Sequence, residues 1–117
     1  MNKHIEKIEI DRKINFPPLC KQFLANEIKD SDTYEINRKD DGAIYFYSYI
    51  DLVERNETYD IQGVEPFYFL IGQDGDLGYF IYVESGKESD VIFSVDLGAL
   101  GSLEMNEEAK DIYSLSA

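Results

Sequence analysis

Residues 66–83 read PFYFLIGQDGDLGYFIYV, with an apolar, aromatic run on either side of a short segment rich in glycine and aspartate. Such runs are typical of β-strands, and we expect strands at Phe67–Ile71 and Tyr79–Val83. Asp-Gly between them indicates a hairpin, because glycine readily adopts the positive φ that a tight turn needs. The stretch therefore predicts two antiparallel strands joined through QDGDLG.

Downstream of the hairpin, the chain continues to predict strands. Val91–Val95 is another apolar run of strand length, and Asp96–Gly101 after it is a turn segment. The tail, Ser102–Ala117, predicts a short strand or helix, in which Ile112 and Leu115 pack against the body of the domain.

Upstream of the hairpin, helices and polar segments predominate. Two prolines, Pro17 and Pro18, break the chain after a first amphipathic segment and pre-set the start of a second helix. In chain order we expect a helix over Asn2–Lys13, a helix from Pro18 to about Ile28, a polar connection at 29–42, a strand at Ala43–Tyr49, a short helix around Asp51–Arg55 and a loop at Asn56–Glu65. Within the first segment, Ile8-Glu9-Ile10 could instead alternate as a strand.

The order of these elements predicts the fold class. Runs of one element type, rather than strict alternation, indicate an α+β fold with a mostly antiparallel sheet. A chain of 117 residues suits a single domain, here spanning residues 1–117. We expect two N-terminal helices packed on that sheet, with a short helix intervening.

Charge is distributed unevenly along the chain. The formal net charge is −13; residues 1–55 contribute −2 and residues 56–117 contribute −11. A field of this sign disfavours nucleic-acid binding and attracts cationic partners. A role in solubility alone remains an open alternative.

Asp74 and Asp76 are the first candidates for chemistry. A calcium loop that starts at Asp74 requires a bidentate glutamate at its twelfth position, which Ser85 occupies. The hairpin corner explains the same residues without a metal, and we expect no metal and no cofactor. A carboxylate pair for hydrolysis carries little weight among 24 acidic residues.

The rest of the sequence gives little support for catalysis. His4 is the one histidine and Cys20 the one cysteine, and a proline break separates them, so no nucleophile and base are paired. A lone, helix-packed cysteine fits a reducing cytosol, and the charged N-terminus lacks a signal-peptide core. We expect a cytoplasmic protein that is not an enzyme.

Tyrosines favour a binding surface. Tyr45, Tyr47 and Tyr49 share one face of the predicted strand, and Tyr82 lies on a neighbouring strand. Tyrosine buries its ring while keeping its hydroxyl in water, which suits interfaces, although these rings could instead border the core. We predict Tyr45, Tyr47 and Tyr82 as anchors of a partner, and the following acidic residues as the groups that steer it: Glu57, Asp60, Asp74, Asp76, Glu84, Glu88 and Asp90.

Four segments resemble a known family. In order along the chain they are INFPPLCKQFL (14–24), YSYIDLVERNETY (47–59), PFYFLIGQDGDLGYFIYV (66–83) and VIFSVDLGALG (91–101). Together they resemble the SUKH superfamily, the fold group around the fungal Smi/Knr regulator of cell-wall glucan synthesis. The resemblance covers about residues 3–101. It departs from the family in the brief ending DIYSLSA, where members usually carry a longer helix.

The resemblance implies a function without chemistry. Bacterial members are immunity proteins that bind a cognate toxin, often a nuclease, in the cytosol, and the family supplies no catalytic residues. We therefore expect a basic protein toxin domain as partner, with no nucleic acid and no membrane, and a monomer or weak homodimer. The alternatives are a cytosolic scaffold or regulator without a toxin and, third, a metal- or carboxylate-dependent hydrolase.

Overall fold

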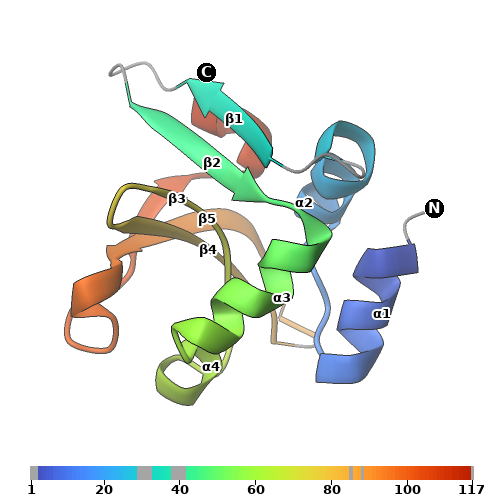
Figure 1. Cartoon of the computed structure of the whole chain (residues 1–117), viewed down its shortest axis with the longest axis horizontal. Coiled ribbons are helices and arrows are strands. Elements are labelled where there is room, and N and C mark those ends of the chain that lie inside the picture. The colour runs from blue at the N-terminus through green and yellow to red at the C-terminus, as the bar shows by residue number, and fades with distance from the viewer. Residues whose placement is uncertain (1–2, 29–32, 38–41, 85, 88, 117) are drawn as a thin grey trace.

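The predicted hairpin lies at the centre of the sheet. In a computed structural model, β3 (Tyr68–Asp74) pairs antiparallel with β4 (Leu77–Tyr82) (Figure 1). Gly75, the first of the two turn residues, has a φ of 60°, as in a type II′ turn. QDGDLG is therefore a chain reversal. The structure describes residues 3–28, 33–37, 42–84, 86–87 and 89–116.

The sheet follows the order of the chain. Within the described residues it has six antiparallel strands in the order β1-β2-β3-β4-β5-β6. The other four are β1 (Thr33–Asn37), β2 (Ala43–Tyr47), β5 (Ser89–Asp96) and β6 (Asn106–Ala109). Each strand thus pairs with its sequence neighbour, which confirms the predicted antiparallel sheet.

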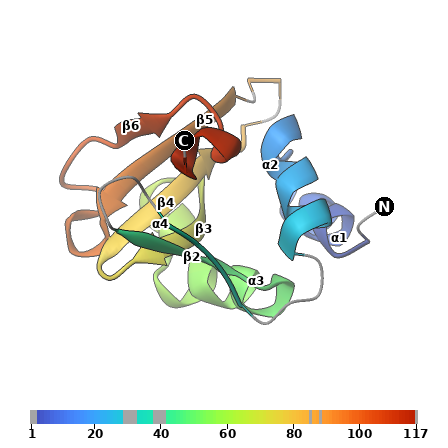
Figure 2. The ribbon, with the colours of Figure 1, turned by 90° about the horizontal axis from the view of Figure 1, so that it is seen from above.

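Helices flank the sheet, and the α+β class is confirmed. Figure 2 shows α1 and α2 on one side of the sheet and α3 beside β2. The described helices are all too short or too polar to cross a bilayer. They are α1 (Lys3–Arg12), α2 (Pro18–Phe23) with the π-helical turn η1 (Leu24–Ile28), α3 (Tyr49–Thr58), α4 (Ile61–Val64) and the 3₁₀ turns η2 (Leu97–Ala99) and η3 (Ile112–Ser116).

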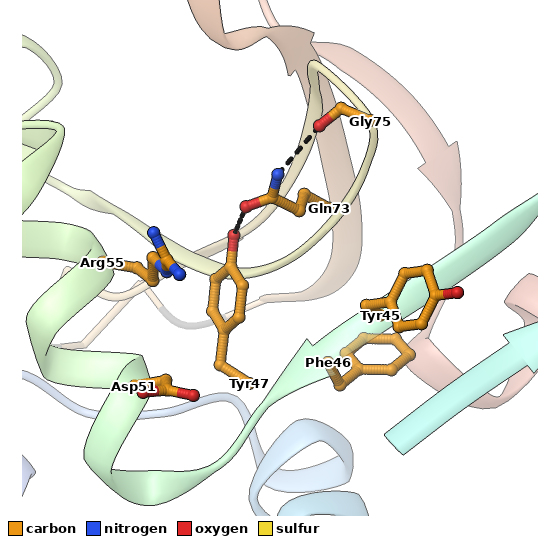
Figure 3. A pocket seen from close by; sticks show the side chains of 7 residues that line it. All are labelled: Tyr45, Phe46, Tyr47, Asp51, Arg55, Gln73 and Gly75. Carbon is orange, nitrogen blue, oxygen red and sulfur yellow. Dashed lines mark hydrogen bonds between the residues drawn. The ribbon is translucent and has the colours of Figure 1, made fainter. Parts of the chain in front are cut away.

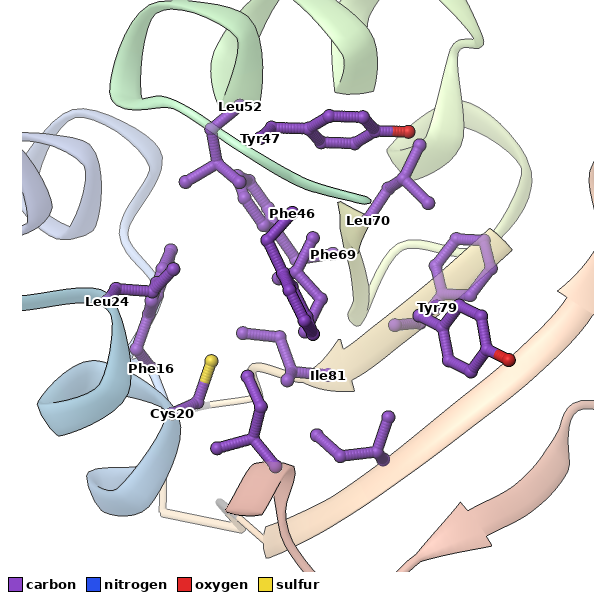
Figure 4. Close-up of a cluster of buried hydrophobic side chains, with 14 of the residues drawn as sticks. Phe16, Cys20, Leu24, Phe46, Tyr47, Leu52, Phe69, Leu70, Tyr79 and Ile81 are labelled. Carbon is purple, nitrogen blue, oxygen red and sulfur yellow. The ribbon is translucent and has the colours of Figure 1, made fainter. Parts of the chain in front are cut away.

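The core lies between the N-terminal helices and one face of the sheet (Figure 4). Phe16, just before α2, packs on Phe69 of β3, and Phe23 of α2 packs on Phe46 of β2, each pair with centroids 5.2 Å apart. Burying one such ring contributes about 1.5–3 kcal/mol. Cys20 is buried among these rings, as predicted.

Two predicted loops contain regular structure. The connection at 29–42 includes β1, where Tyr34 and Ile36 are half-buried and Glu35 and Asn37 are exposed. That alternation is present in the sequence, but it spans only five residues between charged segments. The predicted loop at Asn56–Glu65 is wrong for a similar reason, because α3 continues to Thr58 and the single turn α4 follows.

The start of α3 also corrects the tyrosine pattern. Ser48 is the N-cap, and its hydroxyl accepts a hydrogen bond from the Asp51 amide at 3.4 Å. Tyr49 therefore belongs to the helix and does not share a strand face with Tyr45 and Tyr47. The tail behaves as expected, since Ile112 and Leu115 are buried.

Side chains complete the sheet where β2 leaves β3. These strands pair at Tyr45–Gln73 and Phe46–Gly72, and beyond those pairs none of the described residues forms a strand on that side of the first half of β3. There the Asn56 amide of α3 donates to the Leu70 carbonyl at 2.8 Å and accepts from the Leu70 N–H at 2.8 Å. The amide of Gln62 in α4 donates to the Tyr68 carbonyl at 2.8 Å. Helix side chains thus replace a strand.

Candidate functional site

A pocket of about 320 Å³ lies where β2, α3 and the β3–β4 turn meet (Figure 3). We call it the tyrosine pocket. It is lined by Tyr45, Phe46, Tyr47, Asp51, Arg55, Gln73 and Gly75.

Local structure places these side chains. Tyr45 points away from the helix-covered core because it alternates with Ile44 and Phe46, which are buried. Asp51 and Arg55 are four residues apart, so they lie on the same side of α3. The glycine at position 72 lets β3 approach β2, since a Cβ atom there would lie 2.6 Å from the Tyr45 carbonyl oxygen. The pocket forms at this close approach.

Hydrogen bonds join the pocket wall to the turn. The Tyr47 hydroxyl donates to Oε1 of Gln73, and Nε2 of Gln73 donates to the Gly75 carbonyl at 2.8 Å (Figure 3). Gln73 thus bridges β2 and the hairpin corner. The wall is therefore preorganised, which lowers the entropic cost of binding.

Carboxylates surround the exposed ring. A hydrogen bond with Glu35 raises the pKa of the Tyr45 hydroxyl, and the negative charges of Glu35 and Asp74 raise it further. Burial raises the pKa of Tyr47, and the positive charge of the nearby Arg55 lowers it in part. Nε of Arg55 lies 4.0 Å from the Glu54 carboxylate. The opening of the pocket therefore has negative charge around Tyr45.

The predicted anchors differ in exposure. Tyr45 is 51% exposed, as an anchor needs to be, whereas Tyr47 is only 8% exposed. The expectation that Tyr47 projects like Tyr45 is therefore corrected: its ring is part of the pocket wall. Tyr82 lies on β4 and does not line the tyrosine pocket. Its hydroxyl hydrogen-bonds to Glu84.

The predicted acidic residues do not form one face. Asp74 and Asp76 lie at the β3–β4 turn, beside the pocket. Asp90 is instead structural, because its carboxylate accepts from the Leu19 N–H at 3.1 Å, at the start of α2. A strand residue that faces the helices cannot be distinguished from an outward one by charge alone.

The remaining steering candidates lie elsewhere. Glu57 lies in the last turn of α3, 3.8 Å from an Arg12 guanidinium nitrogen, and Asp60 precedes α4 with a left-handed φ of 52°. The Glu84 carboxylate also forms an ion pair with Lys87, whose Nζ lies 3.4 Å away. Glu88 lies outside the described residues.

Sequence reasoning missed several residues of the pocket. Gln73 was treated only as part of the turn, and Glu35, which hydrogen-bonds to Tyr45 beside the pocket, was assigned to a connection. The i, i+4 spacing of Asp51 and Arg55 is a signal that was available, because it places both groups on one helix side. No sequence signal marks which helix side faces the pocket.

The pocket offers recognition groups. Phenol, guanidinium, amide and carboxylate side chains can hydrogen-bond to polar partners. Among the described residues, no three His, Cys, Asp or Glu side chains are grouped as metal ligands. His4 is exposed on α1, whereas Cys20 is buried, and burial raises the pKa of its thiol.

Comparison with family models gives no match, and no curated protein matches the chain. Inference about function therefore starts from the residues themselves.

Proposed function

We propose that this chain is a non-enzymatic, cytoplasmic immunity protein that binds and occludes a basic toxin domain acting on nucleic acid. The observation that carries the proposal is Tyr45, half exposed at the tyrosine pocket and flanked by Glu35 and Asp74. A ring with a hydroxyl at the edge of a preorganised pocket is a typical interface anchor. Its acidic surroundings select a basic partner.

The chemistry of the target supports the same partner. A protein that acts on nucleic acid needs Lys and Arg side chains to neutralise phosphates. An acidic protein that covers this surface satisfies those charges and blocks substrate access at once. No bond needs to be made or broken, which agrees with the recognition groups of the pocket.

Charge and rings have separate tasks in this mechanism. The net charge of −13 steers encounter over long range, which raises association rates by about 10–10³-fold. The anchor ring then slows dissociation through short-range contacts. The proposal therefore predicts that salt slows association far more than it speeds dissociation.

The primary experiment is co-expression with the product of the neighbouring gene, followed by pull-down and a rescue assay. We expect that product to be toxic alone, to be captured by this chain, and to lose its toxicity when the chain is present. A captured but harmless product would support a scaffold or regulator instead. An anionic partner would overturn the proposal.

Substitutions test the site. Tyr45→Ala should raise the dissociation rate by about thirtyfold, because anchors of this type contribute about 2 kcal/mol. Asp74→Asn with Asp76→Asn should lower the association rate by about threefold or more. Glu6→Gln with Asp11→Asn is the matched control, since it removes the same charge from α1. Equal effects of both double variants would show that only net charge matters.

A calorimetric titration with Ca²⁺, Mg²⁺ and Zn²⁺ tests the hydrolase alternative. Tight, stoichiometric binding that Asp74→Asn and Asp76→Asn abolish would favour the hydrolase alternative over the immunity protein.

A further inference from the structure

A second surface lies on the sheet away from the tyrosine pocket. Four rings follow one another there: Phe67, Tyr82, Tyr68 and Phe93. Their successive centroids are 6.1, 5.4 and 5.3 Å apart. Tyr68 lies opposite Tyr82 in the β3–β4 ladder, so both rings project from the same face. We call these four residues the aromatic row.

The aromatic row is partly open to solvent. Phe67 is 48% exposed, and the other three rings are half-buried. The Tyr82–Tyr68 and Tyr68–Phe93 pairs are T-shaped, with interplanar angles of 77° and 86°. In such pairs one ring turns its edge to its neighbour, and ring faces carry the negative end of the quadrupole. Faces that reach solvent attract cations.

Carboxylates border the aromatic row. Burial raises the pKa of Tyr68, and the charges of Glu65 and Glu107 raise it further. Glu107 lies opposite Phe93 in the β5–β6 ladder. Glu84 binds the Tyr82 hydroxyl and pairs with Lys87, which carries the one positive charge that the described contacts place at the row. The field here is negative.

We propose that the aromatic row is a docking site for an arginine-bearing segment of a protein partner. A guanidinium is planar, stacks on tyrosine faces and pairs with carboxylates in a forked geometry, so it matches rings and acids together. Lysine matches the charge but not the planar stacking.

Two other occupants fit less well. A second copy of this chain would bring Glu65, Glu84 and Glu107 against the same groups in an isologous contact, where like charges oppose association. A nucleic acid would meet the same carboxylates with its phosphates. Charge complementarity therefore favours arginine.

The inference uses none of the tyrosine-pocket residues and does not require the partner to be a toxin. If the neighbouring gene product fails to bind, the aromatic row can still be tested on its own with peptides.

The probe is a capped Gly-Arg-Gly-Arg-Gly peptide, with its lysine and citrulline counterparts, titrated into protein with ¹³C-labelled tyrosine and phenylalanine rings. We expect saturable shifts of the Tyr68, Tyr82 and Phe93 rings with the arginine peptide at low salt. The lysine peptide should bind more weakly. Citrulline keeps the shape without the charge and should bind weakest.

Variants distinguish the row from the pocket. Phe67→Ala should weaken arginine-peptide binding at the row by about two- to fivefold, the size of an exposed cation–π contact. Glu65→Gln and Glu107→Gln should each weaken it by a similar factor. Tyr45→Ala, which removes an equally exposed ring from the tyrosine pocket, should leave the shifts of the row unchanged.

Several results would overturn the inference. These are ring shifts no larger than that of Tyr113 on η3, equal shifts with citrulline, or shifts that Phe67→Ala and both glutamine variants leave intact. Self-association that Phe67→Ala abolishes, seen as a change in the diffusion coefficient, would assign the row to a second copy instead.

Discussion

Asn56 hydrogen-bonds to both backbone groups of Leu70, so one side chain of α3 does the work of a neighbouring strand. The same amide also donates to the Leu52 carbonyl at 2.8 Å and accepts from Gln62 at 3.0 Å. All of this takes place at a residue that is 1% exposed. A buried polar side chain here is therefore a structural requirement of the fold.

Replacement of Asn56 by alanine should lower the free energy of unfolding by about 2–4 kcal/mol, because it leaves buried N–H and C=O groups of Leu70 without partners. Urea unfolding followed by far-UV circular dichroism measures the loss. Asn106→Ala, at the exposed start of β6, is the control and should change stability by less than about 0.5 kcal/mol. Equal losses in the two variants would contradict this role for Asn56.

Gly72 should tolerate no side chain. Its Cβ would meet the Tyr45 carbonyl, a backbone atom that cannot rotate away, so Gly72→Ala should cost about 1–3 kcal/mol and shift the Tyr45 amide resonance. Gly98→Ala is the matched control, because a Cβ atom at position 98 would lie 3.2 Å from its nearest neighbour, a carboxylate oxygen of the Asp96 side chain. A Gly72→Ala variant with wild-type stability and unchanged spectra would show that the close approach of β2 and β3 does not require glycine at this position.

The sequence predicted some elements of the fold and missed others. Strands at 67–71 and 79–83 were found because their apolar runs are long and their turn has glycine. The short strand β1 and the helix α4 were missed, because five and four residues between charged neighbours carry too weak a periodic signal. The amide of Asn56 was invisible, since its partner is a backbone 14 residues away that only tertiary packing brings near.

The candidate site was predictable only in part. Tyr45 was found from strand alternation, and Asp74 and Asp76 from the turn. Tyr47 has the same alternation, but α3 and Gln73 cover it, and a strand pattern does not report what lies above it. Asp90 illustrates the same limit, since its acceptor role at Leu19 depends on a contact 71 residues away.

Cys20 should be unreactive in the folded chain. Burial raises the pKa of its thiol, and the charge of Asp90 adds to this, so little thiolate forms at neutral pH. We expect Ellman's reagent to react with native protein more than about a hundredfold slower than with protein in urea. The chain has one cysteine, so the released chromophore reports this site alone. Rapid, complete reaction without denaturant would show that the core is open.

Glu84 should titrate below the ordinary range. Its hydrogen bond with the Tyr82 hydroxyl lowers its pKa most, burial opposes this shift, and the charge and hydrogen bond of Lys87 lower the pKa further. A depressed pKa contributes stability that is present above the pKa of the unfolded chain and is lost as pH falls through the folded value. The stabilities of wild type and Tyr82→Phe should therefore differ at neutral pH and converge in acid.

Carboxyl ¹³C shifts measured against pH give the Glu84 pKa directly. Tyr82→Phe should raise it more than Lys87→Ala does, because the hydrogen bond from the hydroxyl is the largest single cause of the shift. If Lys87→Ala had the larger effect, the exposed ion pair and not the phenol would be the main cause.

The connection of β2 to β3 through two residue pairs has a consequence for local unfolding. Within the described residues, only these two pairs join the β1–β2 ribbon to the rest of the sheet. The ribbon should therefore detach from β3 before the hairpin of β3 and β4 opens. Its amides should exchange with deuterated solvent sooner than those of Phe80 and Ile81. A ligand bound in the tyrosine pocket would contact both β2 and β3. Its binding should therefore slow amide exchange at Tyr45 and Phe46 without changing the overall shape of the protein.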